Sequence, residues 1–283
     1  MKTALIGNGY WGSKLKRYIP EFFDLADVAD SKTDLSKIWD DESIGSVIIA
    51  TPIETHYQLA RQALEAGKHV FMEKPVTLTG ETAEELKSLA DERGLKIGVE
   101  YTQTFSPSIL KATEVIGQIG DLQYIEMATK HLGRFMKHDV FWLLASHHLS
   151  VLDMFVDLDW LTFMRREWMH HDGLCTTGTL EFKGVCLPSG RVDVSLNYPG
   201  KVMTITFYGS KGTLKHDVMD ALTLTTYSKK RRAHPVELTE SVGRYEFDEL
   251  NNLRFSVEYF RRLLAGEVES NLDTAIKVTK VLE

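Results

Sequence analysis

Three glycines near the start of the chain have the spacing of a nucleotide-binding turn. Gly7, Gly9 and Gly12 form the pattern Gly-x-Gly-x-x-Gly directly after a short apolar run, Thr3 to Ile6. In such a turn the first glycine permits the tight bend, the second lets the backbone approach a pyrophosphate, and the third lets the helix pack close to the strand. The helix that follows presents unpaired N–H groups to the anion. The spacing therefore predicts that a dinucleotide is held by Gly7, Asn8, Gly9, Tyr10, Trp11 and Gly12. The aromatic pair among them either packs against the cofactor or joins the first helix to a second domain.

An acidic residue lies where the second strand of such a fold ends. Asp30 follows the run Leu25 to Ala29 and comes 18 residues after Gly12. A carboxylate at this place accepts hydrogen bonds from the adenosine ribose, and its charge opposes a 2′-phosphate. Asp30 and Ser31 are therefore predicted cofactor residues, and NAD is the favoured cofactor. NADP is the alternative, because Ser31 and Lys32 offer partners for a 2′-phosphate if Asp30 turns away.

A lysine with a proton-transfer role is predicted at the end of a later strand. Lys74 lies between Glu73 and Pro75, after the apolar run His69 to Met72. Open α/β sheets bind their ligands at such strand ends. A lysine that is partly desolvated there loses its proton more readily than a lysine in water. Lys74 is therefore the first candidate to take a proton from a hydroxyl group that is being oxidised; as an ammonium group it would instead hold and polarise the substrate oxygen.

Two histidine pairs, His147-His148 and His170-His171, raise the question of acid/base or metal chemistry. An imidazole can shuttle protons near neutral pH, and Ser146 is a plausible N-cap for a helix that carries the first pair. Neighbours on a helix point about 100° apart, so each pair offers at most one ligand to a common ion. No HExxH motif or carboxylate cluster accompanies them. We therefore expect no metal site.

The elements that must position these residues follow from the hydrophobic pattern. Apolar strands alternate with helical patterns over the first hundred or so residues, and the run Ser46 to Ala50 is almost wholly apolar, as in a strand buried on both faces. A helix is expected from Thr79 to Arg93, closed by Gly94. This alternation predicts a parallel, doubly wound sheet, that is, a dinucleotide-binding Rossmann domain over residues 1–119.

The character of the sequence changes after about Gly120. Segments rich in Thr, Val and Tyr, separated by short turns, predict a large, open and mostly antiparallel sheet. A helix near His147 to Val156 interrupts it, and a helix from Asn252 to Leu264 and a short one from Thr274 close the chain. The fold class is therefore α/β, with an α+β domain for substrate binding and oligomerisation over residues 120–283.

Composition excludes several classes of protein. The chain has 283 residues, of which 43% are hydrophobic and 26% charged, as expected for a packed globule. Its net charge of −7 argues against nucleic-acid binding. Cys175 and Cys186 are expected to be buried thiols of a reducing compartment. We find neither a signal peptide nor an apolar run of the roughly 18 to 20 residues that cross a bilayer. A cytoplasmic protein without membrane contact is expected.

Several segments together resemble the glucose–fructose oxidoreductase / inositol dehydrogenase / MocA (Gfo/Idh/MocA) family. The resemblance covers nearly the whole chain, and its most diagnostic stretch runs from a strand that ends in Thr-Pro to a Glu-Lys-Pro motif. Within the family, the sequence is most similar to members that act on nucleotide-linked amino sugars and their uronic acids. The matching segments are GNGYWG followed by KLKR, VIIATPIETHYQLARQALEAGKHVFMEKP, VEYTQTFSP, SLNYPGKVMTITFYGSKGTLKHD and NLRFSVEYFRRLLAGE.

The resemblance implies further site residues. On the cofactor side these are Thr51, Pro52, His56 and Glu73. On the substrate side they are Lys74, Tyr101, His147 and His148. His147 lies at the position of the family's acid/base histidine. The chain departs from the family at Leu143, which replaces an aspartate four residues before His147, and at His148, which replaces the aspartate after it. The proton relay is therefore weaker, rerouted through His148, Tyr101 or Asp139, or absent.

The resemblance also implies a function and an assembly. We expect an NAD(P)-dependent oxidoreductase that transfers hydride between nicotinamide and a secondary hydroxyl group of a sugar or nucleotide sugar. The alternative is a dinucleotide-binding sensor or regulatory protein with weak or lost catalysis, which Leu143 motivates, together with Thr104 in place of a family arginine. The family's open sheet face often mediates assembly, so a homodimer or homotetramer through the C-terminal sheet is expected.

Overall fold

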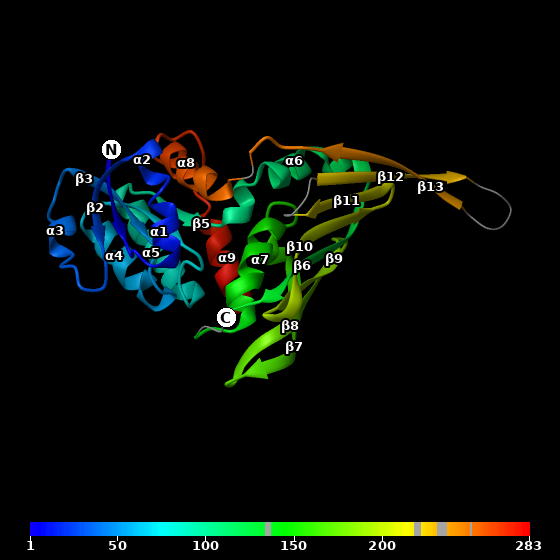
Figure 1. The fold of residues 1–283 in the computed structure, drawn as a ribbon, viewed down its shortest axis with the longest axis horizontal. Helices are drawn as coiled ribbons and strands as arrows, with labels where there is room; N and C mark the ends of the chain where they lie inside the picture. Colours follow the sequence, from blue (N-terminus) through cyan, green and yellow to red (C-terminus); the bar gives the residue numbers. More distant parts are fainter. Residues whose placement is uncertain (134–136, 218–221, 231–236, 250) are drawn as a thin grey trace. The chain divides into compact units, whose positions relative to one another are not determined.

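The computed structural model describes residues 1–133, 137–217, 222–230, 237–249 and 251–283. Contacts divide the chain into two compact units, Met1–Phe105 with Asn251–Glu283, and Ser106–Leu250 (Figure 1). This division differs from the predicted boundary between residues 119 and 120. The first unit ends earlier and takes back the two closing helices, α8 (Asn252–Leu264) and α9 (Leu272–Leu282).

The first unit is built on a five-stranded sheet with the order β2-β1-β3-β4-β5. All neighbouring strands in it run parallel, which confirms the predicted parallel sheet. The chain moves from β1 outward to β2 and then returns to place β3 on the other side of β1. Such a reversal creates a crevice outside the strand ends, where doubly wound sheets bind ligands. The strands are β1 (Lys2–Ile6), β2 (Asp24–Ala29), β3 (Ile44–Ile49), β4 (His69–Glu73) and β5 (Ile97–Glu100).

One helix of this unit, α5 (Gly80–Arg93), begins and ends at residues with a clear physical role. In α5, the Thr79 side chain accepts a hydrogen bond from the Thr82 N–H, and Gly94 ends the helix in the left-handed conformation at φ 64°. The predicted helix from Thr79 to Arg93 is thereby confirmed. The helical segments between the strands are α1 (Tyr10–Leu15), α2 (Ile19–Phe22), α3 (Ser36–Trp39), η1 (Ile53–Thr55), α4 (His56–Glu65), α5 (Gly80–Arg93) and η2 (Thr102–Phe105).

Helix α8 joins the first unit because its apolar stripe completes the core of that unit. Val257, Phe260 and Leu263 are buried at helical spacing in one cluster with residues of the parallel sheet. The Phe260 ring stacks on Phe71 of β4 at 5.1 Å between ring centroids. The edge strand β5 is covered as well, because the Asn271 side chain accepts from the Val99 N–H and donates to the Val99 carbonyl.

The second unit contains an eight-stranded sheet with the order β13-β12-β11-β10-β6-β9-β8-β7. Among these pairs only β6 and β9 run parallel, so the prediction of a mostly antiparallel sheet is confirmed. The strands are β6 (Leu122–Leu132), β7 (Leu161–His171), β8 (Leu174–Gly184), β9 (Ser189–Ser195), β10 (Asn197–Gly209), β11 (Gly212–Asp217), β12 (Leu222–Lys230) and β13 (Glu237–Tyr245).

Helices of the second unit supply the rest of its core. They are α6 (Pro107–Val115), η3 (Ile116–Ile119), the π-helical turn η4 (Phe141–Ala145), α7 (Ser146–Leu152) and η5 (Leu158–Trp160).

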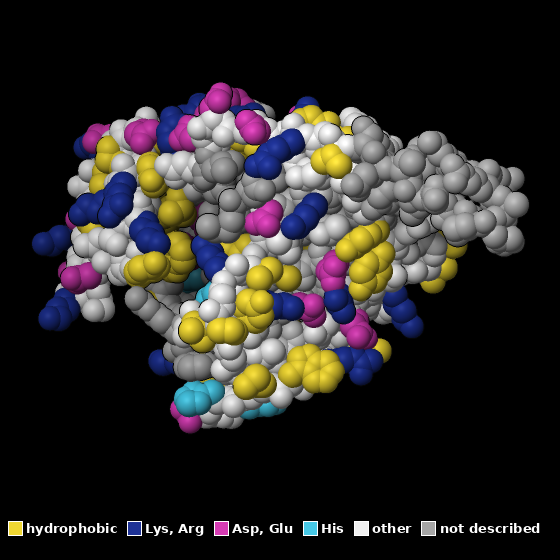
Figure 2. All heavy atoms as spheres, turned by 45° about the vertical axis from the view of Figure 1, so that its right-hand side comes forward, with side chains coloured by type: hydrophobic (Ala, Val, Ile, Leu, Met, Phe, Trp, Pro, Cys, Tyr) yellow, Lys and Arg dark blue, Asp and Glu magenta, His cyan; other side chains and the backbone are white. Residues whose placement is uncertain are grey.

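Both cysteines are free thiols. Cys175 is buried as expected, whereas Cys186 is exposed in the turn after β8, so the prediction that Cys186 is buried was wrong. Figure 2 shows one face of the molecule, where hydrophobic side chains lie among Lys, Arg, Asp and Glu. Within the described part of the chain, we find no helix long and apolar enough to span a membrane.

The packing of α8 leads to a stability prediction. Phe260→Ala removes a fully buried ring that contacts Phe71 and Phe23, so we expect a loss of about 3–5 kcal/mol in the free energy of unfolding. Urea denaturation followed by fluorescence measures it. Leu110→Ala is the control, because that side chain is 46% exposed and its loss should change stability by about 0.5 kcal/mol or less. Equal losses for the two variants would contradict the placement of α8 in this core.

Candidate functional site

The ends of the parallel strands bring most of the predicted cofactor residues to one edge of the sheet. Gly7 follows β1, Asp30 follows β2, Thr51 lies just beyond β3, Glu73 ends β4 and Tyr101 follows β5. Because the strands are parallel, their carboxyl ends all lie at this edge. The sequence placed these residues correctly relative to the strands. Their roles remain predictions.

The glycine turn needs two of its glycines for folding and leaves the third open. Gly7 has a φ of +100°, and a Cβ atom there would lie 2.5 Å from the Ala50 carbonyl oxygen. A Cβ on Gly12 would lie 1.8 Å from the Gly7 carbonyl oxygen, so only glycine permits this approach of α1 to the turn. A Cβ on Gly9 would meet nothing within 4 Å. No side chain caps the start of α1 at Gly9. The turn therefore offers an open stretch of backbone that fits a pyrophosphate.

The two aromatic residues of the turn lie in contact with each other and with a lysine. Tyr10 and Trp11 are 58% and 47% exposed, and their rings meet edge to face at 5.2 Å. The Lys14 amine lies over both rings, 4.1 Å and 4.5 Å from their centroids. This cation–π arrangement keeps a positive charge beside the start of α1. A positive charge there favours an anionic ligand.

The carboxylate of Asp30 is held in a defined position by the turn that follows it. It accepts hydrogen bonds from the Lys32 N–H at 2.8 Å and from the Thr33 hydroxyl at 3.1 Å. The Asp30 N–H in turn donates to the Thr33 oxygen. The structure thus adds Thr33, which the sequence did not suggest, as the residue that orients Asp30. The exposed carboxylate keeps the place predicted for a ribose partner.

His56 connects the loops that follow β3 and β4. Its side chain is buried, with Nδ1 2.8 Å from the Pro75 carbonyl oxygen and Nε2 2.9 Å from the Thr51 carbonyl oxygen. Burial lowers the pKa of His56, while the two backbone hydrogen bonds act in the opposite direction. Both ring nitrogens face backbone carbonyl oxygens, and the neutral ring donates its one N–H to either of them. His56 therefore braces the Thr51 and Pro75 loops and has no ring nitrogen left for the cofactor contact that was predicted.

Lys74 has two buried carboxyl groups beside it, one of which the sequence analysis missed. Glu73 on β4 and Glu100 on β5 are register partners, and they are only 8% and 2% exposed. Burial and the neighbouring Glu100 raise the pKa of Glu73 well above its usual value. Burial lowers the pKa of Lys74 to about 8, against the attraction of both carboxylates. The signal for Glu100 was present in the sequence, as an acidic residue at the end of an apolar run, but only strand pairing places it beside Glu73.

Tyr101 directly follows β5 and is buried. The residue is fully buried, and its N–H donates to the Val99 carbonyl oxygen at 3.0 Å. The ring was predicted to contact substrate. In the structure it packs into protein, which favours a supporting role.

The histidine pair of the second unit is split between two environments. His148 is 1% exposed, its Nε2 lies 2.8 Å from the Thr129 hydroxyl, and burial lowers its pKa to about 3. The sequence predicted that His148 contacts the substrate. In the structure His148 is a buried core residue, and its low pKa keeps the ring neutral. His147 is half-buried on α7, which follows a π-helical turn of the kind often found at functional sites.

Asp139, and not Ser146, caps the helical segment that leads to His147. Its Oδ1 accepts from the Phe141 N–H at 2.9 Å, and its Oδ2 lies 2.5 Å from the Arg165 guanidinium. The predicted N-cap at Ser146 is wrong because the π-helical turn already precedes that residue, and the Ser146 hydroxyl donates to the Trp142 carbonyl oxygen. Asp139 is thereby occupied by a helix start and an ion pair. A relay through Asp139 has little support.

One group of potential metal ligands occurs among the described residues. The donor atoms of Glu167, His170 and Cys175 lie within 4.8 Å of one another. However, the Glu167 carboxylate already lies 2.6 Å from the Arg165 guanidinium and 2.7 Å from His170 Nε2. The arginine charge opposes a dication at this place. The group is better explained as an ion pair with a neighbouring thiol.

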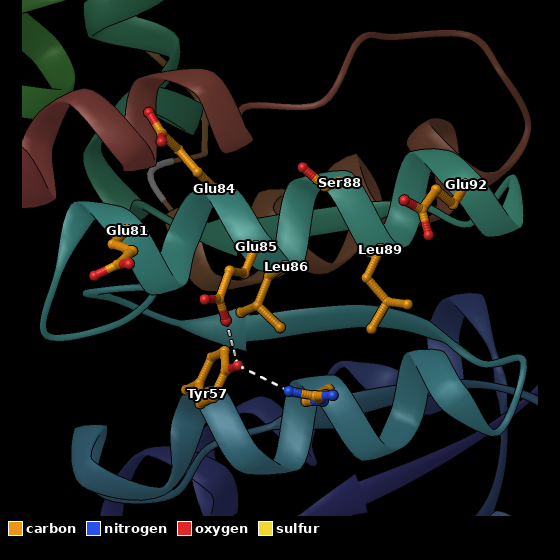
Figure 3. Close-up of a pocket in the computed structure, with 9 residues that line it drawn as sticks. Tyr57, Glu81, Glu84, Glu85, Leu86, Ser88, Leu89 and Glu92 are labelled. Atoms are coloured by element: carbon orange, nitrogen blue, oxygen red, sulfur yellow. Dashed lines mark hydrogen bonds between the residues drawn. The ribbon is translucent and has the colours of Figure 1, made fainter.

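A groove on the outer side of the first unit lies between α4 and α5. It has a volume of about 510 Å³, and Tyr57 donates to Glu85 across it and accepts from Arg61 (Figure 3). Four glutamates line it, Glu81, Glu84, Glu85 and Glu92. This excess of negative charge would repel a pyrophosphate. None of the predicted site residues lines the groove, so the strand ends remain the candidate site.

Comparison with known proteins supports this choice. The model of the GFO_IDH_MocA family, described as an oxidoreductase family with an NAD-binding Rossmann fold, matches residues 11–101. The scyllo-inositol 2-dehydrogenase (NADP+) IolW of Bacillus subtilis is 38% identical over 142 residues, which cover 44% of this chain and 39% of that protein. The chain spans less than half the length of the curated relatives it matches; the uncharacterized oxidoreductase YfiI of Bacillus subtilis is covered over 23% of its length and the 2,7-anhydro-N-acetylneuraminate hydratase of Mediterraneibacter gnavus over 40%.

Solved structures resemble the chain over its whole length. UDP-N-acetylglucosamine 3-dehydrogenase GnnA from Acidithiobacillus ferrooxidans superposes with a TM-score of 0.85 at 17% identity, covering 99% of this chain and 94% of that one. GenD2 from gentamicin A biosynthesis, in complex with NAD, gives a TM-score of 0.82 at 20% identity, covering 100% and 92%. Identities this low establish the shared two-unit fold alone. Residues 11–101 match the model of the same Gfo/Idh/MocA oxidoreductase family that the sequence motifs resemble.

Proposed function

We propose that this chain is an NAD(P)-dependent oxidoreductase that transfers hydride between nicotinamide and a secondary hydroxyl group of a sugar or nucleotide sugar. The observation that carries the proposal is the combination, at one edge of a parallel sheet, of an open glycine turn, an oriented acidic residue and a desolvated lysine. Relatives named as inositol and UDP-N-acetylglucosamine dehydrogenases support the substrate class. The sheet edge itself supports the cofactor.

The residues at the strand ends fit the parts of a nicotinamide dinucleotide. When bound, the dinucleotide supplies the hydride acceptor. The turn from Gly7 to Gly12, with Asn8, Tyr10 and Trp11, would hold the pyrophosphate, and Asp30 with Ser31 would hold the adenosine ribose. Thr51 and Pro52 border the site next to the turn. The Thr51 side chain lies so close to Gly7 that a Cβ atom added to this glycine would be 2.9 Å from the Thr51 methyl carbon. NAD is the favoured form because the Asp30 carboxylate opposes a 2′-phosphate; NADP is the alternative, as the name of IolW illustrates.

Lys74 is the group that would move the hydroxyl proton. Above its pKa of about 8 the amine is neutral and takes the proton of the hydroxyl group as the carbon is oxidised. Below that pH the ammonium group donates to the oxygen of a carbonyl substrate in the reverse direction. His147 is the second candidate for acid/base work, on the resemblance. Leu143 offers its imidazole no carboxylate partner, so Lys74 is the first choice.

A homodimer or homotetramer through the sheet of the second unit belongs to the same proposal. Strand β7 carries several exposed large hydrophobic side chains, Met164, Trp168 and Met169, which are 50%, 61% and 50% exposed. Exposed apolar side chains of this size are typical of surfaces that bind another protein.

Gly9→Ala tests the dinucleotide site without disturbing the fold. The new Cβ meets no protein atom within 4 Å, so the unfolding midpoint should not change, whereas a pyrophosphate against the backbone would be obstructed. We expect the Kd for the dinucleotide to rise by about ten-fold or more, which corresponds to about 1.4 kcal/mol. Calorimetry measures it, with Gly117→Ala as the control because its Cβ also meets nothing. Unchanged affinity in Gly9→Ala would exclude this turn as the binding site.

Lys74→Met tests the catalytic assignment. Loss of a general base lowers turnover by about 10²–10⁴-fold, while dinucleotide affinity should stay within a few-fold of wild type. Reduced-nicotinamide formation is followed against a panel of UDP-sugars and free cyclitols. Lys87→Met, an exposed lysine paired with Asp273 on the same unit, is the matched control and should retain turnover. If Lys74→Met turns over at the wild-type rate, Lys74 is not the base. Dinucleotide binding without turnover of any sugar in wild type would favour the regulatory alternative.

The pKa of Lys74 sets the expected pH dependence. Oxidation requires the neutral amine, so kcat/KM should rise about ten-fold per pH unit below pH 8 and level off above it. Reduction of the corresponding carbonyl compound requires the ammonium group and should show the opposite slope. Initial rates between about pH 6 and pH 9 measure both limbs. A flat oxidation profile in this range would contradict proton transfer by Lys74.

A further inference from the structure

Two buried carboxyl groups lie side by side at the ends of β4 and β5. Glu73 and Glu100 are register partners on adjacent parallel strands, which are about 4.8 Å apart in sheets of this kind. The Oε1 atom of each is buried and has no hydrogen-bond partner among the described residues. The other carboxylate oxygen of Glu100 accepts a hydrogen bond from the Thr102 hydroxyl at 2.8 Å. Each carboxyl group thus has a buried oxygen whose hydrogen bonding is incomplete.

The charges around the pair do not balance if both carboxyl groups are ionised. Among the described residues, the positive charge that acts on both is that of Lys74. His56 also interacts with Lys74; burial lowers the pKa of its ring, and a neutral ring has one N–H to donate to either the Pro75 or the Thr51 carbonyl oxygen. From α8, hydrogen bonding of the Ser256 side chain to the Glu100 carboxyl group lowers the pKa of Glu100, and the Ser256 hydroxyl also lies 2.9 Å from the Leu253 carbonyl oxygen. The Tyr259 hydroxyl donates to the Glu269 carbonyl. Two carboxylates against one ammonium group would leave a buried negative charge, which is costly.

A single additional proton removes this imbalance. One ammonium group, one carboxylate and one carboxylic acid together carry no net charge. The acid supplies an O–H donor, and the ionised partner on the adjacent strand supplies an acceptor. Like-charged carboxyl groups in one site commonly share a proton for this reason.

We propose that Glu73 and Glu100 share one proton at neutral pH, and that Glu100 thereby acts as a positioning residue that sets the charge beside Lys74. The functional consequence rests on the proposed dehydrogenase function. The single negative charge of the pair stabilises the Lys74 ammonium group, so the pair sets the pH above which Lys74 is neutral.

Infrared spectroscopy tests the shared proton without reference to activity. At pH 7 the wild-type protein should show the C=O band of one protonated carboxyl group, and labelling glutamate with ¹³C should shift that band. Glu73→Gln and Glu100→Gln should each abolish it, because the remaining carboxylate then pairs with the Lys74 ammonium group. Lys74→Met should increase its area about two-fold, since both carboxyl groups must then be protonated to stay neutral. Glu126→Gln, which removes an ion-paired carboxylate of the second unit, is the control and should leave the band unchanged.

Several results would overturn the proposal. Absence of a ¹³C-sensitive carboxylic acid band in the wild type at pH 7 is one, and this measurement needs no variant to fold. Survival of the band in both glutamine variants is another, as is an unchanged band in Lys74→Met.

A second arm connects the pair to Lys74. In the double variant Glu73→Gln/Glu100→Gln the ammonium group loses both attractions, so the acid limb of the kcat/KM profile should move to lower pH by about one unit or more. An acid limb that does not move would contradict the positioning role. If no sugar is turned over at all, the proposed function fails while the infrared result still decides the shared proton.

Discussion

Parallel pairing of the five strands is the constraint on which the candidate site depends. Because every crossover returns the chain to the same starting edge, the carboxyl ends of all strands meet at the opposite edge. Strands β1, β3, β4 and β5 are mostly buried, and the predicted site residues lie at or just beyond the strand ends. The glycine turn, Asp30, the His56 brace and the Lys74 group all lie there. The parallel sheet thus gathers the candidate site residues at one edge.

Burial at this edge has opposite effects on the groups of opposite charge. It lowers the pKa of Lys74 to about 8 and raises the pKa values of Glu73 and Glu100, so that proton transfer among them becomes easier near neutral pH. The glycine turn needs no ionisable group, since backbone N–H groups serve an anion. One sheet edge can therefore hold an anionic cofactor beside a lysine whose charge is adjustable.

Features that depend on local sequence were predictable, and features that depend on long-range packing were not. The glycine turn, the helix from Thr79 to Gly94 and the strand before Lys74 follow from spacing, capping and hydrophobic runs. The position of α8 was not predictable, because its apolar stripe fits either domain. Only the contact between Phe260 and Phe71 assigns the helix to the first unit. Glu100 was missed and the burial of His148 was not predicted for the same reason: strand pairing and tertiary packing decide their environments, which no local sequence pattern shows.

The most direct test of this account is a titration of the ¹⁵N-labelled protein with NAD⁺, followed by the chemical shifts of assigned backbone amides. If the strand ends hold the dinucleotide, the largest changes should occur at Gly9, Tyr10, Trp11 and Asp30, with amides of the α4–α5 groove unaffected. Changes confined to the groove lined by Glu81, Glu84 and Glu85, or no saturable change at the glycine turn, would contradict the central claim.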